Sequence, residues 1–434
     1  MSGLRNRRKK KTDTADSKKN NMPEQPMLLL FHTIQDKIRH IPGTQNKLLV
    51  KMVTRSLVAT IMFIIAGLIL NAGHIVVGGV IFLLQVMVFK ELLDVRYAVN
   101  KEKGIPYFRT VVWMWFAVAC VYSFANPDLL NLPFHEFDVL QSTYTILQFQ
   151  LGAAQIHEWI SFSLYVMTFC FTVLSLKKGH FEYQMQQLAW TMLSIILVTM
   201  QSKGVILNVY NGLFWVVFPA TLVIVNDVMA YFCGVAMGRK IYKGPFLPDL
   251  SPNKTWEGFA GAGIFTVLAG WYLPMIWGSN KYMICSFNDW NQNGENCAIP
   301  RVFVPEEFEI WQLSLFYDEG TALPKFTASE MQLHGMCLAV FASCIAPFGG
   351  FFASAIKRAY GIKDFGVLFP GHGGFTDRLD CQFIMGFCTN IHYHTFIVPR
   401  VIGFASVLAA IGSMDRSDDL NQIILSAKSR LSAL

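Results

Sequence analysis

Long apolar segments separated by polar loops constrain the fold more than any other feature of the sequence. They lie at approximately residues 57–70, 75–89, 110–124, 159–176, 188–199, from 205 onward, 259–276, 333–352 and 382–398. Runs of about 20 apolar residues are long enough to cross a bilayer as helices. Only 15% of the 434 residues are charged, against about 25% in soluble domains. The sequence therefore predicts an all-α, polytopic integral membrane protein with about nine transmembrane helices.

The charges between these segments predict which side of the membrane each loop faces. Residues 1–50 are interpreted as a basic, disordered tail followed by a surface helix, and no apolar stretch typical of a cleaved signal peptide follows the tail closely. Basic loops, such as the charged loop at residues 90–103, stay cytosolic. We therefore expect a cytosolic N-terminus that either contacts anionic lipids or only sets the orientation. The net charge of +7 lies largely in this tail and a few loops, so no nucleic-acid partner is expected.

A predicted turn at residues 201–204 divides the chain into two transmembrane regions, residues 51–204 and residues 205–434. The second region contains a polar insertion, residues 279–330, with more acidic than basic side chains. The number of preceding crossings places this insertion on the lumenal side. Its two cysteines, Cys285 and Cys297, are predicted to form a disulfide, with two free thiols as the alternative.

A polar stretch at residues 354–380, between two apolar segments, has the clearest chemical signal. Basic residues come first, then a glycine-rich turn, then two carboxylates three residues apart. Ionisable groups beside a bilayer are costly and tend to mark function. Backbone N–H groups of the glycine turn can surround an anion, and Asp377 with Asp380 can hold Mg²⁺. If a helix starts near Asp377, this spacing puts both carboxylates on one face.

Two other polar elements precede this stretch. Asn226 and Asp227 lie deep in the sixth apolar segment, where they need either a hydrogen-bond partner on another helix or a polar cavity. The basic loop that follows ends in the motif SPNKTWEG at residues 251–258, in which Ser251 has the alternative role of a helix cap. Two further predicted crossings return the chain to the same face, so we expect Lys254 to share one pocket with residues 354–380.

These motifs resemble those of the eukaryotic phosphatidate cytidylyltransferases, also called CDP-diacylglycerol synthases. The family patterns S-x-x-K-R, K-D and H-G-G-x-x-D-R-x-D are matched by Ser354 with Lys357-Arg358, by Lys363-Asp364, and by His372-Gly373-Gly374 with Asp377-Arg378 and Asp380. A second family motif, S-P-x-K-T-x-E-G, is similar to residues 251–258, and an Asp-x-x-Ala-Tyr element is similar to Asp227, Ala230 and Tyr231. Asn253 departs from the lysine that many relatives have.

The resemblance implies that CTP and phosphatidate react to give CDP-diacylglycerol and pyrophosphate, at a cytosol-facing site in the endoplasmic reticulum membrane. It implies that residues 205–434 are the catalytic region, with catalytic roles for Asp377, Asp380, Asp364 and Lys254 and Mg²⁺ bound by the three aspartates. The substrate-binding residues would be Lys357, Arg358, Lys363, His372, Gly373, Gly374, Arg378, Asp227 and Ser251. Membrane lipids and a second copy of the chain, in a homodimer, are the other expected partners.

Two other function classes compete with this interpretation. A transporter or scramblase of anionic lipids would spread charges over several segments at mid-membrane depth, whereas here they cluster at one face. A CDP-alcohol phosphotransferase also uses Mg²⁺ and aspartates beside a membrane. Its D-G-x-x-A-R…G-x-x-x-D-x-x-x-D spacing is missing from this sequence, because Asp377 and Asp380 are three residues apart. The sequence therefore favours the cytidylyltransferase.

Overall fold

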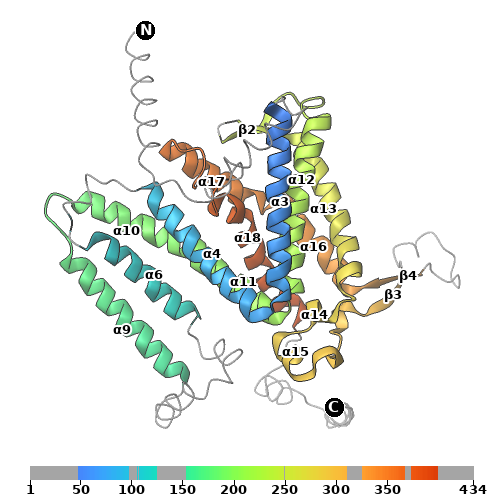
Figure 1. The fold of residues 1–434 in the computed structure, drawn as a ribbon, viewed down its shortest axis with the longest axis horizontal. Coiled ribbons are helices and arrows are strands. Elements are labelled where there is room, and N and C mark those ends of the chain that lie inside the picture. Colours follow the sequence, from blue (N-terminus) through green and yellow to red (C-terminus); the bar gives the residue numbers. More distant parts are fainter. Residues whose placement is uncertain are drawn as a thin grey trace, which may run out of the picture. The chain divides into compact units, whose positions relative to one another are not determined.

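The computed structural model describes residues 47–96, 105, 107–124, 153–248, 250–309, 325–366 and 373–398. Helices dominate this part of the chain, together with two short antiparallel hairpins (Figure 1). The predicted all-α membrane fold is confirmed. The basic tail, most of the predicted surface helix and His372 lie outside the described residues. Residues up to Ile391 form one compact unit, and those from His392 onward form a second.

Six of the described helices are long and apolar enough to cross a membrane. They span His74–Val95, Ile156–Leu174, Phe181–Asn211, Phe214–Met237, Trp256–Trp277 and Glu330–Tyr360. The apolar helices at Ser56–Asn71 and Phe108–Phe124 are shorter. The predicted number of about nine transmembrane helices is therefore not confirmed, although the chain crosses the membrane several times.

Four helices form the first part of the described chain: α3 (Lys47–Asn71), α4 (His74–Val95), α6 (Phe108–Phe124) and α9 (Ala153–Leu174). The first two apolar segments are separated at residues 72–73, where Gly73 has a φ of 102°. Helix α4 continues to Val95, so it includes the first residues of the loop that the sequence placed at 90–103. The helix continues there because its polar residues find partners on other elements, as the contacts of Glu91 below show.

The predicted turn at residues 201–204 is wrong. Helix α10 (Phe181–Ile195), the π-helical turn η1 (Ile196–Met200) and helix α11 (Gln201–Asn211) form one continuous helix. The Ser202 hydroxyl is satisfied within this helix by a 2.6 Å hydrogen bond to the Val198 carbonyl. The proposed boundary between residues 204 and 205 thus falls inside a helix. The chain breaks instead at Gly212, whose φ of 133° is accessible to glycine but strained for other residues.

The second part of the chain contains the polar motifs. Helix α12 (Phe214–Met237) is followed by the hairpin of β1 (Pro245–Leu247) and β2 (Ser251–Thr255), and then by helix α13 (Trp256–Trp277). Asn226 of α12 pairs with Thr266 of α13, since the Thr266 hydroxyl donates to Asn226 Oδ1 at 3.4 Å. Asn226 therefore has the structural, interhelical role that the sequence left open, and its neighbour Asp227 is exposed.

The predicted segment at residues 333–352 lies in one candidate membrane span that is interrupted at residues 345–346. Helix α16 (Glu330–Cys344) ends before Ala346, and helix α17 (Pro347–Tyr360) starts with proline at its first position, where the missing N–H has no consequence. Helix α18 (Thr376–His392) and the π-helical turn η5 (Tyr393–Ile397) complete the described chain. The expected helix start near Asp377 is confirmed.

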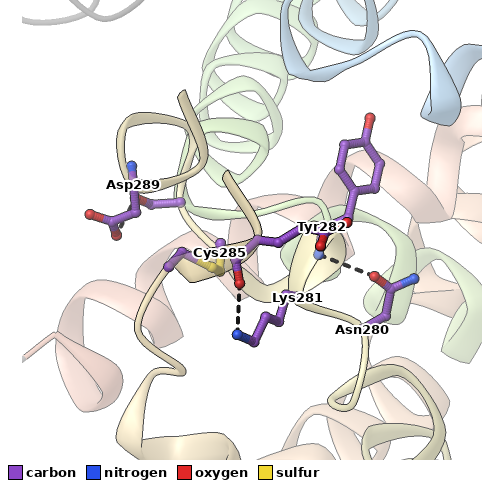
Figure 2. Close-up of a disulfide and its surroundings, with 8 residues drawn as sticks. Asn280, Lys281, Tyr282, Cys285 and Asp289 are labelled. Carbon is purple, nitrogen blue, oxygen red and sulfur yellow. Dashed lines mark hydrogen bonds between the residues drawn. A yellow bond between two sulfur atoms is a disulfide. The ribbon is translucent and has the colours of Figure 1, made fainter. Parts of the chain in front are cut away.

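The insertion at residues 279–330 forms a small substructure of its own. It contains the short helices α14 (Lys281–Ile284) and α15 (Phe287–Asn293), and the hairpin of β3 (Pro305–Glu309) and β4 (Lys325–Ser329). Cys285 and Cys297 form the predicted disulfide, so the alternative of two free thiols is wrong (Figure 2). In Figure 1 these elements lie at the opposite end of the helices from β2 and α17.

Candidate functional site

A carboxylate on α4, Glu91, holds the start of α18 in place. It accepts hydrogen bonds from the backbone N–H groups of Phe375 at 3.0 Å and Thr376 at 2.8 Å. N–H groups in the first turn of a helix have no partner within the helix, and a negative charge there is favourable. The approach is close enough that a Cβ at Gly374 would lie 2.5 Å from the Glu91 carboxylate. Gly374 is therefore required for this contact.

Asp377 closes the same turn from the other side. Its Oδ2 accepts hydrogen bonds from the backbone N–H groups of Phe365 at 2.9 Å and Gly374 at 3.0 Å, while Lys357 Nζ lies 2.7 Å from Oδ1. The Asp377 side chain is only 5% exposed. Both of its oxygens are thus engaged by the protein. The N–H group of Gly374, one of the glycines expected to surround an anion, is bonded to Asp377 in this structure, and those of Phe375 and Thr376 are bonded to Glu91.

Asp380 is engaged less completely than Asp377. The Cys381 backbone N–H donates to Asp380 Oδ1 at 2.9 Å, and the Cys381 thiol also hydrogen-bonds to the Asp380 carboxylate. It lies in the first turns of α18, outside the six long apolar helices, and close enough to Asp227 of α12 for their charges to repel. Burial raises the pKa of Asp380 to about 6, and the charge of Asp227 adds to this effect. A cation bound between the two carboxylates would instead lower the pKa of Asp380.

The β1–β2 hairpin delivers Lys254 to the same place. Lys254 Nζ lies 4.4 Å from the ring centroid of Phe351 on α17. Its ammonium group is also close enough to attract the carboxylate of Asp227. The loop that leads from α12 to the hairpin is held by the buried carboxylate of Glu257, which accepts backbone hydrogen bonds of 2.8–3.2 Å from residues 239, 241 and 242. Lys254 therefore lies beside α17, the helix that carries Lys357, and near Asp227, which in turn lies near Asp380. A single pocket shared by Lys254 and residues 354–380 stays a prediction. The side of the membrane that it faces stays a prediction.

The remaining predicted residues differ in exposure. The side chains of Arg358, Lys363, Asp364 and Arg378 are exposed, whereas that of Ser251 is partly buried. The charge of Arg378 also reaches Asp227. These exposed cations stand where a charged molecule can approach them, and their roles in binding stay predictions.

The carboxylates suit Mg²⁺ only in part. In the described ranges no group of three or more His, Cys, Asp or Glu side chains is placed to hold a metal ion. Mg²⁺, however, usually takes one or two carboxylates and completes its shell with substrate phosphate oxygens and water. Asp380 and Asp227 fit that description, whereas Asp377 is bonded to Lys357 and two N–H groups, and Asp364 is exposed.

Sequence reasoning missed Glu91, which no motif includes and which precedes Phe375 by 284 residues. The available signal was an acidic residue only two positions after the apolar segment at 75–89, close enough to belong to the same helix. It also missed the role of Glu257, although this residue is part of a recognised motif.

Comparison with known proteins identifies relatives over most of the chain. Residues 53–396 match the model of the cytidylyltransferase family. The chain is 40% identical over 352 residues to a probable phosphatidate cytidylyltransferase of Dictyostelium discoideum, covering 80% of this chain and 71% of the relative. It is 38% identical over 348 residues to the phosphatidate cytidylyltransferase of Saccharomyces cerevisiae, covering 79% and 72%, and 33% identical over 355 residues to human phosphatidate cytidylyltransferase 2, covering 79% and 74%.

Proposed function

Because the chain belongs to the cytidylyltransferase family, we propose that it converts CTP and phosphatidate into CDP-diacylglycerol and pyrophosphate. The observation that carries this proposal is the convergence of Lys254, Asp380 and the Lys357–Asp377 pair near Asp227 of α12. These residues come from four separate segments, and their charges suit a triphosphate beside a lipid phosphate.

The reaction needs charge stabilisation and positioning more than proton transfer. A phosphate oxygen of phosphatidate attacks the α-phosphorus of CTP, and the bond from that phosphorus to the oxygen bridging to the β-phosphate breaks. Pyrophosphate leaves with the electron pair of this bond. The attacking phosphate is already ionised at neutral pH, so no strong general base is required. Donors and cations aimed at the developing charge then supply most of the rate enhancement.

Asp380 and Asp227 are the residues that we place around Mg²⁺. When bound, such an ion neutralises charge on the reacting phosphates. In this scheme Asp377 fixes the turn through Lys357 and holds α18 in the orientation that presents Asp380. Direct metal binding by Asp377 and Asp364 stays a prediction, because the former is engaged by protein donors and the latter is exposed.

The accessible cations of the site are placed on the phosphates. We assign Lys254 to the triphosphate, because it is exposed and interacts electrostatically with Asp227, one of the two carboxylates that we place around Mg²⁺. Arg358, Lys363 and Arg378 are exposed on the neighbouring segments and are assigned to the triphosphate and the lipid phosphate together.

The competing function classes have less support. An anionic-lipid transporter would need charged residues along a path through the membrane. Here Lys254, Asp380 and the Lys357–Asp377 pair lie in or beside the elements at one end of the helices, and the chain is related to cytidylyltransferases. A CDP-alcohol phosphotransferase is not supported by any of these similarities.

A direct assay tests the proposal. The full-length protein, purified in detergent, is given CTP, phosphatidate and Mg²⁺, and the formation of CDP-lipid and pyrophosphate is measured. The expected result is a product that requires all three components. Failure of the folded wild-type protein to form a CDP-lipid would overturn the proposal.

Location, orientation and assembly are proposed as well. We place the protein in the endoplasmic reticulum membrane as a homodimer, with the N-terminus and the site facing the cytosol and the disulfide-bearing insertion facing the lumen, where disulfides persist. Cysteines introduced at positions 254 and 363 should react alike with a membrane-impermeant reagent in sealed, oriented vesicles. Protection of one and exposure of the other would contradict a shared face. Light scattering of the purified protein gives the oligomeric state.

A further inference from the structure

An apolar cavity of about 240 Å³ lies directly beside Asp380. Its walls come from α4, the π-helical turn η1, the first residue of α11, α17, α18 and Phe365. The side chains that give it its apolar character include Val88, Leu92, Leu197, Phe348, Phe352 and Ile384. The transfer chemistry proposed above uses none of these six side chains.

The lining of this cavity favours an apolar occupant over water. Cavities lined by aliphatic and aromatic side chains hold water poorly and accept apolar molecules, and most of the side chains that line this cavity are of these kinds. Phe348 and Phe352, which line it, are also exposed at the surface of the described chain. Burial of apolar surface is favourable in itself. A molecule that enters from the bilayer therefore suits the cavity.

One part of the cavity wall is polar. It is lined by Asp380, Thr376 and Gln201. Thr376 is 6% exposed, and its hydroxyl has no hydrogen-bond partner within the part of the chain that the structure describes. Buried hydroxyl groups normally have a partner, so an occupant with an acceptor group is favoured. The occupant should therefore be an amphiphile, with an apolar body and a polar, hydrogen-bonding head.

We propose that this cavity is an acyl subsite, which holds one acyl chain of phosphatidate. The ester carbonyl of that chain accepts a hydrogen bond from Thr376 Oγ1, and the lipid phosphate lies at the Asp380 side, among the charges of the site. This inference rests on the proposed function and extends it. It assigns recognition of the lipid chain to α4, η1, α17 and α18, mainly through residues that no sequence motif includes.

Substitutions at Ile384 test the apolar part of the subsite. Ile384 is partly buried and lies one helical turn beyond Asp380, so Ile384→Phe fills the cavity away from its polar side. We expect it to raise KM for dioleoyl phosphatidate about tenfold, to affect dihexanoyl phosphatidate less, and to leave KM for CTP unchanged. The matched control is Ile264→Phe, the same replacement in a separate apolar groove on α13 and α16. Equal effects of the two variants, or an unchanged KM for Ile384→Phe, would overturn the subsite.

Thr376→Val tests the polar part, since it removes the hydroxyl and keeps the shape. It should raise KM for ester-linked phosphatidates of both chain lengths, but not for an ether-linked analogue, which lacks the carbonyl acceptor. An equal loss with ester and ether lipids would show that Thr376 acts only in folding, and would overturn this contact.

Photocrosslinking tests occupancy without catalysis. Phosphatidate with a diazirine in one acyl chain is irradiated with the full-length protein in nanodiscs, without CTP or Mg²⁺, and labelled peptides are identified by mass spectrometry. Labels on α4, α17 and α18 that Ile384→Phe reduces are the expected result. Labels confined to α13 and α16, or equal labelling by a diazirine fatty acid without phosphate, would contradict the proposal. Because this measurement needs no turnover, a wild-type protein that forms no CDP-lipid would disprove the activity while the crosslinks still report on the cavity.

Discussion

The carboxylate of Glu91 accepts a 3.0 Å hydrogen bond from the backbone N–H of Phe375, although the two residues are 284 positions apart in the chain. With the second bond, from the Thr376 N–H, it joins α4 to the first turn of α18. Since α18 carries both Asp377 and Asp380, the position of the site depends on a helix from the other half of the protein.

Replacement of Glu91 by glutamine should weaken this junction. An amide has one acceptor oxygen instead of two, so one buried N–H loses its partner, at a cost of about 1–3 kcal/mol. We expect a lower melting temperature and a larger relative loss of turnover, because Asp380 loses its fixed position. Thermal unfolding and activity in detergent measure both effects. Glu158→Gln, at an exposed position on α9, is the control and should change neither. A Glu91→Gln protein as stable and active as wild type would contradict the role of this contact.

The Lys357–Asp377 pair should behave as a buried ion pair rather than a surface one. Lys357 and Asp377 side chains are 14% and 5% exposed, and removal of one partner from such a pair typically costs about 3–5 kcal/mol because the other charge stays buried. Lys357→Met and Asp377→Asn should each lower the free energy of unfolding by amounts of this order, and the double variant should lose less than their sum. Additive losses would show that the two side chains do not interact.

The exposed pair Arg301–Glu306 provides the control for this cycle. Its side chains are 80% and 39% exposed, and pairs of this kind contribute about 0–1 kcal/mol. Arg301→Met should therefore have little effect on the free energy of unfolding. Denaturant titration in detergent micelles measures this quantity for all of these variants.

Local patterns predicted the elements and motifs correctly where one segment determines the outcome. The apolar segments became helices, the spacing of Asp377 and Asp380 fell at a helix start, and Cys285 paired with Cys297. The turn at residues 201–204 failed because polar residues such as Ser202 bond to their own helix when buried among other helices. Periodicity and composition do not distinguish a polar turn from a buried helical stretch whose polar side chains bond within the helix.

The functions of single side chains were harder to predict because they depend on partners far apart in the chain. Asp377 and Asp380 look equivalent in the sequence, yet the first is surrounded by Lys357 and two N–H groups and the second faces Asp227. Glu91 carries no signal beyond its position after an apolar segment. Only the packing of α4, α12, α17 and α18 separates a carboxylate that holds the turn from one available to a ligand.

Loss of the disulfide should reduce stability without changing catalysis. Cys285 and Cys297 close a short loop with a separation of 12 residues, for which the chain-entropy account gives about 3 kcal/mol. The Cys285→Ser/Cys297→Ser protein should melt at a lower temperature, yet its kcat per folded molecule should match wild type, since the disulfide and the site lie at opposite ends of the helices (Figure 1). Dithiothreitol should shift the wild-type melting temperature and leave that of the double variant unchanged. A large fall in kcat would instead indicate coupling between the two ends.

Asp380→Asn should separate a role in catalysis from a role in stability. If Asp380 holds Mg²⁺ at the phosphates, loss of its charge should lower turnover by orders of magnitude. Stability without Mg²⁺ should stay the same or rise, because a partly buried carboxylate that faces Asp227 is replaced by a neutral group. If Asp380 only favours the helix dipole, the variant should be about 0.3–1 kcal/mol less stable and almost fully active. Turnover across a Mg²⁺ titration, combined with thermal unfolding of the same sample, distinguishes these outcomes. Asp364→Asn, assayed in parallel, shows whether the exposed third carboxylate also belongs to the metal site.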